Sequence, residues 1–139
     1  MIVLDTNVLS ELLRPVPDAR VANWFRAQAQ ASLFTTVITR SEMLYGVCLL
    51  PPGKRRDVLL REVLALFTVD MAGRVLNYDG EAADAYAQIA AMRRANGRRH
   101  EKPFDAMIAG IVRSLGAKLA TRNVRDFEGC GIGLIDPWQ

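Results

Sequence analysis

Short apolar or β-prone segments alternate along this chain with segments that have the periodicity of helices. The predicted strands lie at residues 2–4, 33–36, 75–78, 118–121 and 134–135. A strand with no polar face, such as residues 2–4, is typical of a parallel sheet covered on both sides. The alternation therefore predicts an α/β fold, with a mostly parallel sheet and helices on both faces. The length of 139 residues fits a single domain over residues 1–139.

Capping residues and prolines set the predicted helix boundaries. Thr6 is the predicted cap of a first helix that reaches Leu13. The sequence Thr39-Arg-Ser-Glu42 has the pattern of a capping box, which predicts a helix from there to about residue 50. Further helices are predicted at 18–25, 54–67 and 79–97. Pro103 is the predicted first residue of a helix that is apolar almost all round, and such a helix is buried.

Composition excludes several classes of protein. Half of the residues are hydrophobic and 24% are charged, which is typical of a soluble globular chain. Cys48 and Cys130 form no C-x-x-C pattern, so we expect neither a zinc site nor a disulfide scaffold. His100 is the single histidine, so catalysis would depend on carboxylates. The longest apolar run, residues 43–53, is too short to span a membrane, and we expect a cytoplasmic protein without a signal peptide or membrane contact.

Acidic and amide side chains follow the predicted strands or begin the helices after them. Asp5 ends the first strand, and Glu42 lies in the predicted first turn of the helix after the second. Asp105 lies in the first turn of the buried helix, and Asn123 and Asp126 follow the strand at 118–121. Each alone is explained as a helix cap or a turn residue, but ligands of parallel sheets bind at this edge.

Carboxylates gathered at one edge repel one another by several kcal/mol, about 4 for a pair at 4 Å in an effective dielectric near 20. A divalent cation removes this repulsion, and an all-oxygen set of ligands selects Mg²⁺ or Mn²⁺. The sequence therefore predicts a metal site formed by Asp5, Glu42 and Asp105. Asn123 and Asp126 are the further candidates for catalytic residues.

Basic residues form two groups in a chain whose net charge is +3. The first comprises Lys54, Arg55, Arg56 and Arg61, and the second comprises Arg93, Arg94, Arg98, Arg99, His100 and Lys102. Solvated helix ends explain both groups, but phosphate binding is the functional alternative. A carboxylate-held cation beside such groups favours phosphodiester chemistry, with Lys54, Arg55, Arg56, Arg98, Arg99 and Lys102 as the residues that contact nucleic acid.

Five motifs, in order along the whole chain, resemble those of the PIN-domain ribonucleases, and most closely the VapC and FitB-like toxins of bacterial type II toxin–antitoxin modules. They are IVLDTNVLS at 2–10, TRSEMLYG at 39–46, PFDAMIA at 103–109, ATRNVRDF at 120–127 and PW at 137–138. The resemblance implies a three-layer α/β/α fold and an endoribonuclease dependent on Mg²⁺, with Mn²⁺ as an alternative. It also implies a homodimer and a small antitoxin that binds over the active site.

The resemblance further implies that Asp5, Glu42 and Asp105 form the metal-binding core, with Asp5 and Asp105 most directly on the metal. A fourth acid of the family often falls where this chain has Asn123, which brings no charge. Whether Asn123 or Asp126 serves as the fourth site residue stays open at this point, as does the choice between one metal and two.

Two other functions compete with the nuclease. Phosphotransfer proteins of the haloacid-dehalogenase or receiver type also place an aspartate after the first strand. This chain has Asn7 where the former type has a second acid, and Lys118 begins its strand instead of following it. The other alternative is a non-catalytic nucleic-acid-binding module in which the acids are only helix caps. RNA cleavage is the leading hypothesis, and the sequence does not identify the RNA.

Overall fold

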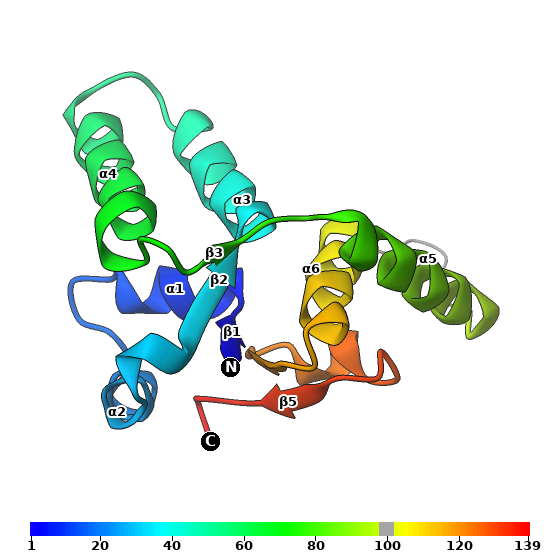
Figure 1. Cartoon of the computed structure of the whole chain (residues 1–139). Coiled ribbons are helices and arrows are strands. Elements are labelled where there is room, and N and C mark those ends of the chain that lie inside the picture. Colours follow the sequence, from blue (N-terminus) through cyan, green and yellow to red (C-terminus); the bar gives the residue numbers. More distant parts are fainter. Residues whose placement is uncertain (98–101) are drawn as a thin grey trace.

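The computed structural model describes residues 1–97 and 102–139, so Arg98, Arg99 and His100 lie outside the described residues. Five parallel strands form one sheet in the order β3-β2-β1-β4-β5 (Figure 1). Their bounds are β1 Ile2–Leu4, β2 Leu33–Thr36, β3 Val75–Leu76, β4 Lys118–Ala120 and β5 Gly133–Ile135. The predicted parallel sheet is confirmed, with β3 two residues shorter than expected. The central strand β1 pairs with β2 on one side and β4 on the other.

Helices cover both faces of this sheet, which confirms the three-layer α/β/α arrangement. They are α1 Thr6–Leu12, α2 Ala19–Ala27, α3 Val37–Cys48, α4 Lys54–Ala65, α5 Gly80–Ala95 and α6 Pro103–Ser114. Because successive strand residues face opposite sides, Val3 belongs to a core with α5 and α6, and Leu4 to a core with α1 and α2. No helix in the described part of the chain is long and apolar enough to cross a membrane.

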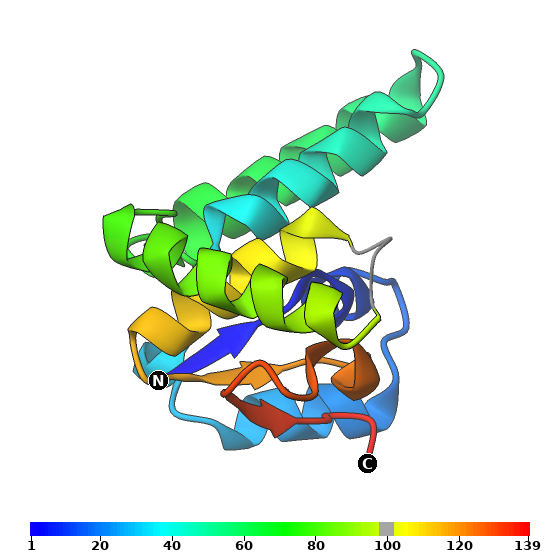
Figure 2. The same cartoon turned by 90° about the vertical axis from the view of Figure 1, so that its right-hand side faces the viewer.

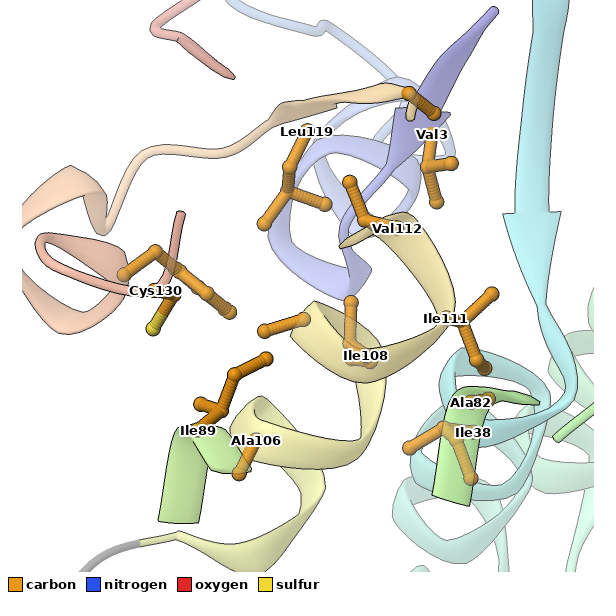
Figure 3. Packing of buried hydrophobic residues seen from close by; sticks show 13 residues of the cluster. Val3, Ile38, Ala82, Ile89, Ala106, Ile108, Ile111, Val112, Leu119 and Cys130 are labelled. Atoms are coloured by element: carbon orange, nitrogen blue, oxygen red, sulfur yellow. The ribbon is translucent and has the colours of Figure 1, made fainter. Parts of the chain in front are cut away.

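Helix α6 is buried as predicted, and it forms the centre of the first core. In Figure 3 the side chains of Ile108 and Val112 point toward Val3 and Leu119 of the sheet. On its other side α6 packs closely against α5, at Gly110. A Cβ atom added there would lie 2.7 Å from the carbonyl oxygen of Ala82, so this approach requires glycine. This packing determines where the first turn of α6 stands relative to α5.

The start of α3 differs from the prediction. The helix begins at Val37, because the hydroxyl of Thr36 at the end of β2 accepts the backbone N–H of Thr39, 3.1 Å away. Thr39 is therefore inside the helix and the capping box is wrong. Glu42 lies in the second turn, where its carboxylate is free of a capping role. Similarly, Asp5 caps α1 in place of Thr6, by accepting the Thr6 N–H.

Helices α3 and α4 run side by side and are joined by residues 49–53, and Figure 2 shows them projecting together from the sheet. Between them and α1 lies a cavity of about 1170 Å³. A short helical turn, η3 (Val124–Phe127), follows β4 and carries Asp126. These connections place side chains from four segments at the carboxyl edge of the sheet.

Candidate metal centre

Four acids reach the carboxyl edge of the sheet from four different segments. Asp5 directly follows β1 and Glu42 lies in α3, which follows β2. Asp105 is the third residue of α6, and Asp126 lies in η3 after β4. Since β1, β2 and β4 are parallel neighbours, the segments that follow them begin at the same edge.

Asp5 is the most buried of these acids, with 5% of its surface exposed. Its Oδ2 accepts the hydroxyl of Thr121 at 2.7 Å and the side-chain amide of Asn7 at 3.3 Å, and its Oδ1 accepts the Thr6 N–H at 2.8 Å. Burial raises the pKa of Asp5, and the hydrogen bonds from Thr121 and Thr6 oppose this rise. The charges of Glu42 and Asp126 raise the pKa of Asp5 further.

Glu42 is connected to the same centre through Thr6. The Thr6 hydroxyl lies 2.8 Å from Oε1 of Glu42 and 3.2 Å from Oγ1 of Thr39. Burial raises the pKa of Glu42, the hydrogen bond from Thr6 lowers it, and the charge of Asp105 raises it. Thr6 thus donates its backbone N–H to Asp5 and its hydroxyl to Glu42, which sets the spacing of the two carboxylates.

Asp105 completes the acidic group. Its pKa is raised to about 6, firstly by burial and then by the charge of Asp5, with a further contribution from Asp126. Lys102 and Arg93 oppose this shift. Each of the acids Asp5, Glu42, Asp105 and Asp126 therefore lies within electrostatic range of at least two of the others, as an α/β sheet edge predicts. We call these four residues the acidic cluster.

Asn123 and Thr121 complete the edge of the cluster. Asn123 is exposed, and its backbone N–H donates to Oγ1 of Thr121 at 3.1 Å. Asp126 lies three residues later, in η3, and its charge acts on Asp5 and Asp105. Sequence reasoning assigned no role to Thr121, which is fully buried beside Asp5. A threonine at a strand end opposite an aspartate is the only signal for it, because their contact joins residues 116 positions apart.

The cluster fits a hard divalent cation by its chemistry. The side chains that converge here offer carboxylate and hydroxyl oxygens, the ligands that Mg²⁺ and Mn²⁺ prefer. Within residues 1–97 and 102–139, no group of three or more His, Cys, Asp or Glu side chains is arranged so that it could hold a metal ion by itself. Mg²⁺ is commonly held by only one or two carboxylates, together with waters and substrate phosphates. The pKa values of Asp5, Glu42 and Asp105 are raised firstly by burial and secondly by the charges of neighbouring acids, and a bound cation would favour the charged forms against both.

The predicted nucleic-acid-binding residues differ in where the structure places them relative to the cavity and the acidic cluster. Lys54 and Arg55 line the cavity between α1, α3 and α4. Glu42 and Thr6 line the same cavity, so the cavity reaches the acidic cluster. Arg56 is half-buried and is not among the lining residues. Lys102 is exposed at the start of α6, and its charge acts on both Glu42 and Asp105. Arg93 is 2% exposed, so its assignment to a phosphate-binding surface is wrong.

Comparisons with known proteins identify the family. Residues 2–129 match the PIN domain. Over 140 residues, the chain is 44% identical to the plasmid stability protein StbB of Pseudomonas syringae pv. tomato, with 100% of this chain and 99% of the relative covered. It is 37% identical over 139 residues to the VapC ribonuclease Y4jK of Sinorhizobium fredii, again with 100% and 99% covered. The crystal structure of FitAcB from Neisseria gonorrhoeae is 34% identical and superposes with a TM-score of 0.90, covering 100% of this chain and 99% of that one.

The parallel sheet covered by helices on both faces is thus that of a PIN domain, and this chain belongs to the PIN-domain family. Within the family it is similar along its whole length to VapC and FitB-like toxins. The resemblance inferred from the five sequence motifs is confirmed.

Proposed function

We propose that this protein is a Mg²⁺-dependent endoribonuclease and the toxin of a type II toxin–antitoxin module. The observation that carries the proposal is the acidic cluster, in which four carboxylates share one sheet edge and three have raised pKa values. Relatives named VapC ribonuclease and tRNA(fMet)-specific endonuclease VapC support it, at 37% and 31% identity.

In this proposal Asp5, Glu42 and Asp105 hold the cation, which is Mg²⁺ or Mn²⁺. When bound, the cation supplies positive charge that stabilises the charge developing on the phosphoryl oxygens. Thr121 and Thr6 hold the carboxylates of Asp5 and Glu42 in place through their hydrogen bonds. Such bonds to the charged form of an acid favour that form, which is the form a cation binds.

Asp126 is our candidate for orienting the attacking water, because its charge acts on the cluster and the other three acids are assigned to the cation. The water oxygen forms a bond to phosphorus, and a carboxylate accepts the proton of the water. The ester P–O bond on the leaving side breaks with its electron pair going to the leaving oxygen, which takes a proton from solvent. Lys54 and Arg55, on the cavity that contains Glu42, and Lys102 beside Asp105 neutralise neighbouring phosphates. Arg56, Arg98 and Arg99 remain candidates for the same role.

The partners are an RNA substrate, a small antitoxin and a second copy of the chain. The cavity that leads to Glu42 has mostly apolar walls, from residues such as Leu13, Val47 and Val58. An antitoxin segment that places apolar side chains there and a cation beside Glu42 would exclude RNA from the site. The full-length similarity to FitAcB, whose crystal structure has a TM-score of 0.90 to this chain, supports a partner of this kind.

The test compares wild type with Asp105→Asn, using Asp84→Asn on the exposed face of α5 as the matched control. We expect wild type and Asp84→Asn to cleave RNA with Mg²⁺ and to lose cleavage in EDTA. Asp105→Asn should cut at least about 100-fold more slowly and should no longer arrest growth when expressed.

Equal cleavage by Asp105→Asn would refute the site. RNA binding that is unchanged in EDTA, without cleavage by wild type, would favour the binding module instead. A phosphoryl group trapped on Asp5 by an acyl phosphate would favour the phosphotransfer protein.

A further inference from the structure

Arg93 is a buried arginine that the proposed chemistry does not use. It lies in the last turn of α5, where the basic sequence around it predicts a solvated helix end, yet only 2% of its surface is exposed. Burying a guanidinium is costly unless hydrogen bonds and opposite charge compensate for the lost water. A surface arginine that merely complements the helix dipole would have stayed in solvent. The burial of Arg93 therefore requires a reason inside the protein.

The side chain of Arg93 connects α5 to the loop that carries Asp126. Its Nη2 donates to the backbone carbonyl oxygen of Asp126 at 2.7 Å, across 33 residues of sequence. Its positive charge also acts on Asp105, in the first turn of α6. Arg93 thus contacts η3 through a hydrogen bond and lies within electrostatic range of Asp105. It therefore joins α5 to η3 and acts on α6 by its charge, and η3 and α6 each carry one acid of the cluster.

The hydrogen bond is made to the backbone of Asp126, so it constrains the position of that residue in the chain. An arginine is suited to this task because its planar guanidinium offers several donors in a rigid arrangement. If η3 shifted, the carboxylate of Asp126 would move relative to Asp5 and Asp105, on both of which its charge acts.

We propose that Arg93 is a positioning residue of the acidic cluster, which fixes η3 against α5 and thereby sets where the Asp126 carboxylate stands. The inference rests on the proposed function in one respect: it takes the acidic cluster as the site that binds a divalent cation and cleaves RNA. Arg93 touches neither, and acts through Asp126.

A purely electrostatic role of Arg93 predicts the opposite change in the cluster's affinity for a cation. If Arg93 acted only as a fixed positive charge near Asp105, its removal would make the cluster more negative and cation binding tighter. If it positions Asp126, its removal loosens the arrangement and cation binding becomes weaker. The sign of the change in cation affinity therefore separates the two roles.

The experiment uses the whole protein with Arg93→Met, Arg93→Lys and the control Arg26→Met. Arg26 lies in the last turn of α2, so its variant removes a helix-end arginine away from the cluster. Calorimetric titration with Mn²⁺ should show binding about 10-fold weaker in Arg93→Met, and kcat for RNA should fall about 10-fold with little change in KM. Arg93→Lys, which keeps the charge and a donor, should recover most of both losses, and Arg26→Met should match wild type.

A second comparison places Arg93→Met in an Asp126→Asn background. Because Arg93 acts through Asp126, the added effect there should stay within about twofold. Tighter Mn²⁺ binding by Arg93→Met, a full added effect in the Asp126→Asn background, or an Arg93→Lys as impaired as Arg93→Met would each overturn the proposal. If Arg93→Met does not fold, Arg93→Gln, which removes the charge but keeps a side-chain donor, makes the same comparison in the two backgrounds. The Mn²⁺ titrations need no RNA, so a wild type that fails to cleave RNA refutes the proposed function and leaves this inference open to its own test.

Discussion

Replacing Gly110 by alanine tests whether the close packing of α5 on α6 is essential. The added Cβ would stand 2.7 Å from the carbonyl oxygen of Ala82 and 3.1 Å from the backbone nitrogen of Tyr86. Both atoms belong to the backbone, so no side-chain rotation relieves the overlap and the two helices must move apart. Overpacking costs about 1–3 kcal/mol, and a contact with backbone places this case near 3.

The new alanine also favours the helical state by about 1 kcal/mol relative to glycine. The net loss in the free energy of unfolding is therefore about 2 kcal/mol, which lowers Tm by roughly 6 °C in a chain of this size. Because α6 carries Asp105 five residues earlier, separation of the helices should also weaken RNA cleavage.

Thermal and urea unfolding measure the effect, with Gly46→Ala as the control. Gly46 lies within α3 and an added Cβ would meet nothing within 4 Å, so this variant gains only the helical preference of about 1 kcal/mol. The two substitutions are chemically identical and differ only in their surroundings. If Gly110→Ala proved as stable as wild type, or gained stability as Gly46→Ala does, the reasoning from close packing would be refuted.

Two further predictions concern charge. The folded-state pKa of Asp105 is about 6 against an ordinary 3.8, so metal-free wild type should lose stability as pH rises through that window. In EDTA near pH 8, the free energy of unfolding of Asp105→Asn should therefore be about 1 kcal/mol higher than that of wild type, after allowance for partial exposure. Near pH 4 the two proteins should be equally stable. A variant less stable than wild type near pH 8 would contradict this reasoning. Replacing Lys54 and Arg55 by glutamine should weaken RNA binding and lower its salt slope by about 1.4, whereas Arg26→Gln with Lys118→Gln, the same charge change, should not.

Local sequence was sufficient for most of the architecture. Strand and helix periodicities, with prolines and capping residues between them, specify each element through neighbours in the chain, and the parallel sheet follows from their alternation. The same reasoning predicted that Asp5 and Asp105 stand at the carboxyl edge, because a strand end and a helix start are local features. The buried character of α6 was likewise evident from residues 106–115 alone.

Contacts between distant residues were beyond that reasoning. The start of α3 depends on where β2 ends, so Thr36 became the cap and Glu42 was released to meet Thr6, 36 residues away in the sequence. Thr121 acquires its role only through its contact with Asp5.

Arg93 is the clearest case of a residue whose surroundings could not be predicted from the sequence. Its charge and its basic neighbours predict a solvated surface position, but in the fold Arg93 is buried and donates to the backbone carbonyl oxygen of Asp126. Sequence determines which residues a helix carries and where the acids fall along the chain. Which face of that helix turns inward, and what its side chains meet there, was decided only when the helices packed on the sheet.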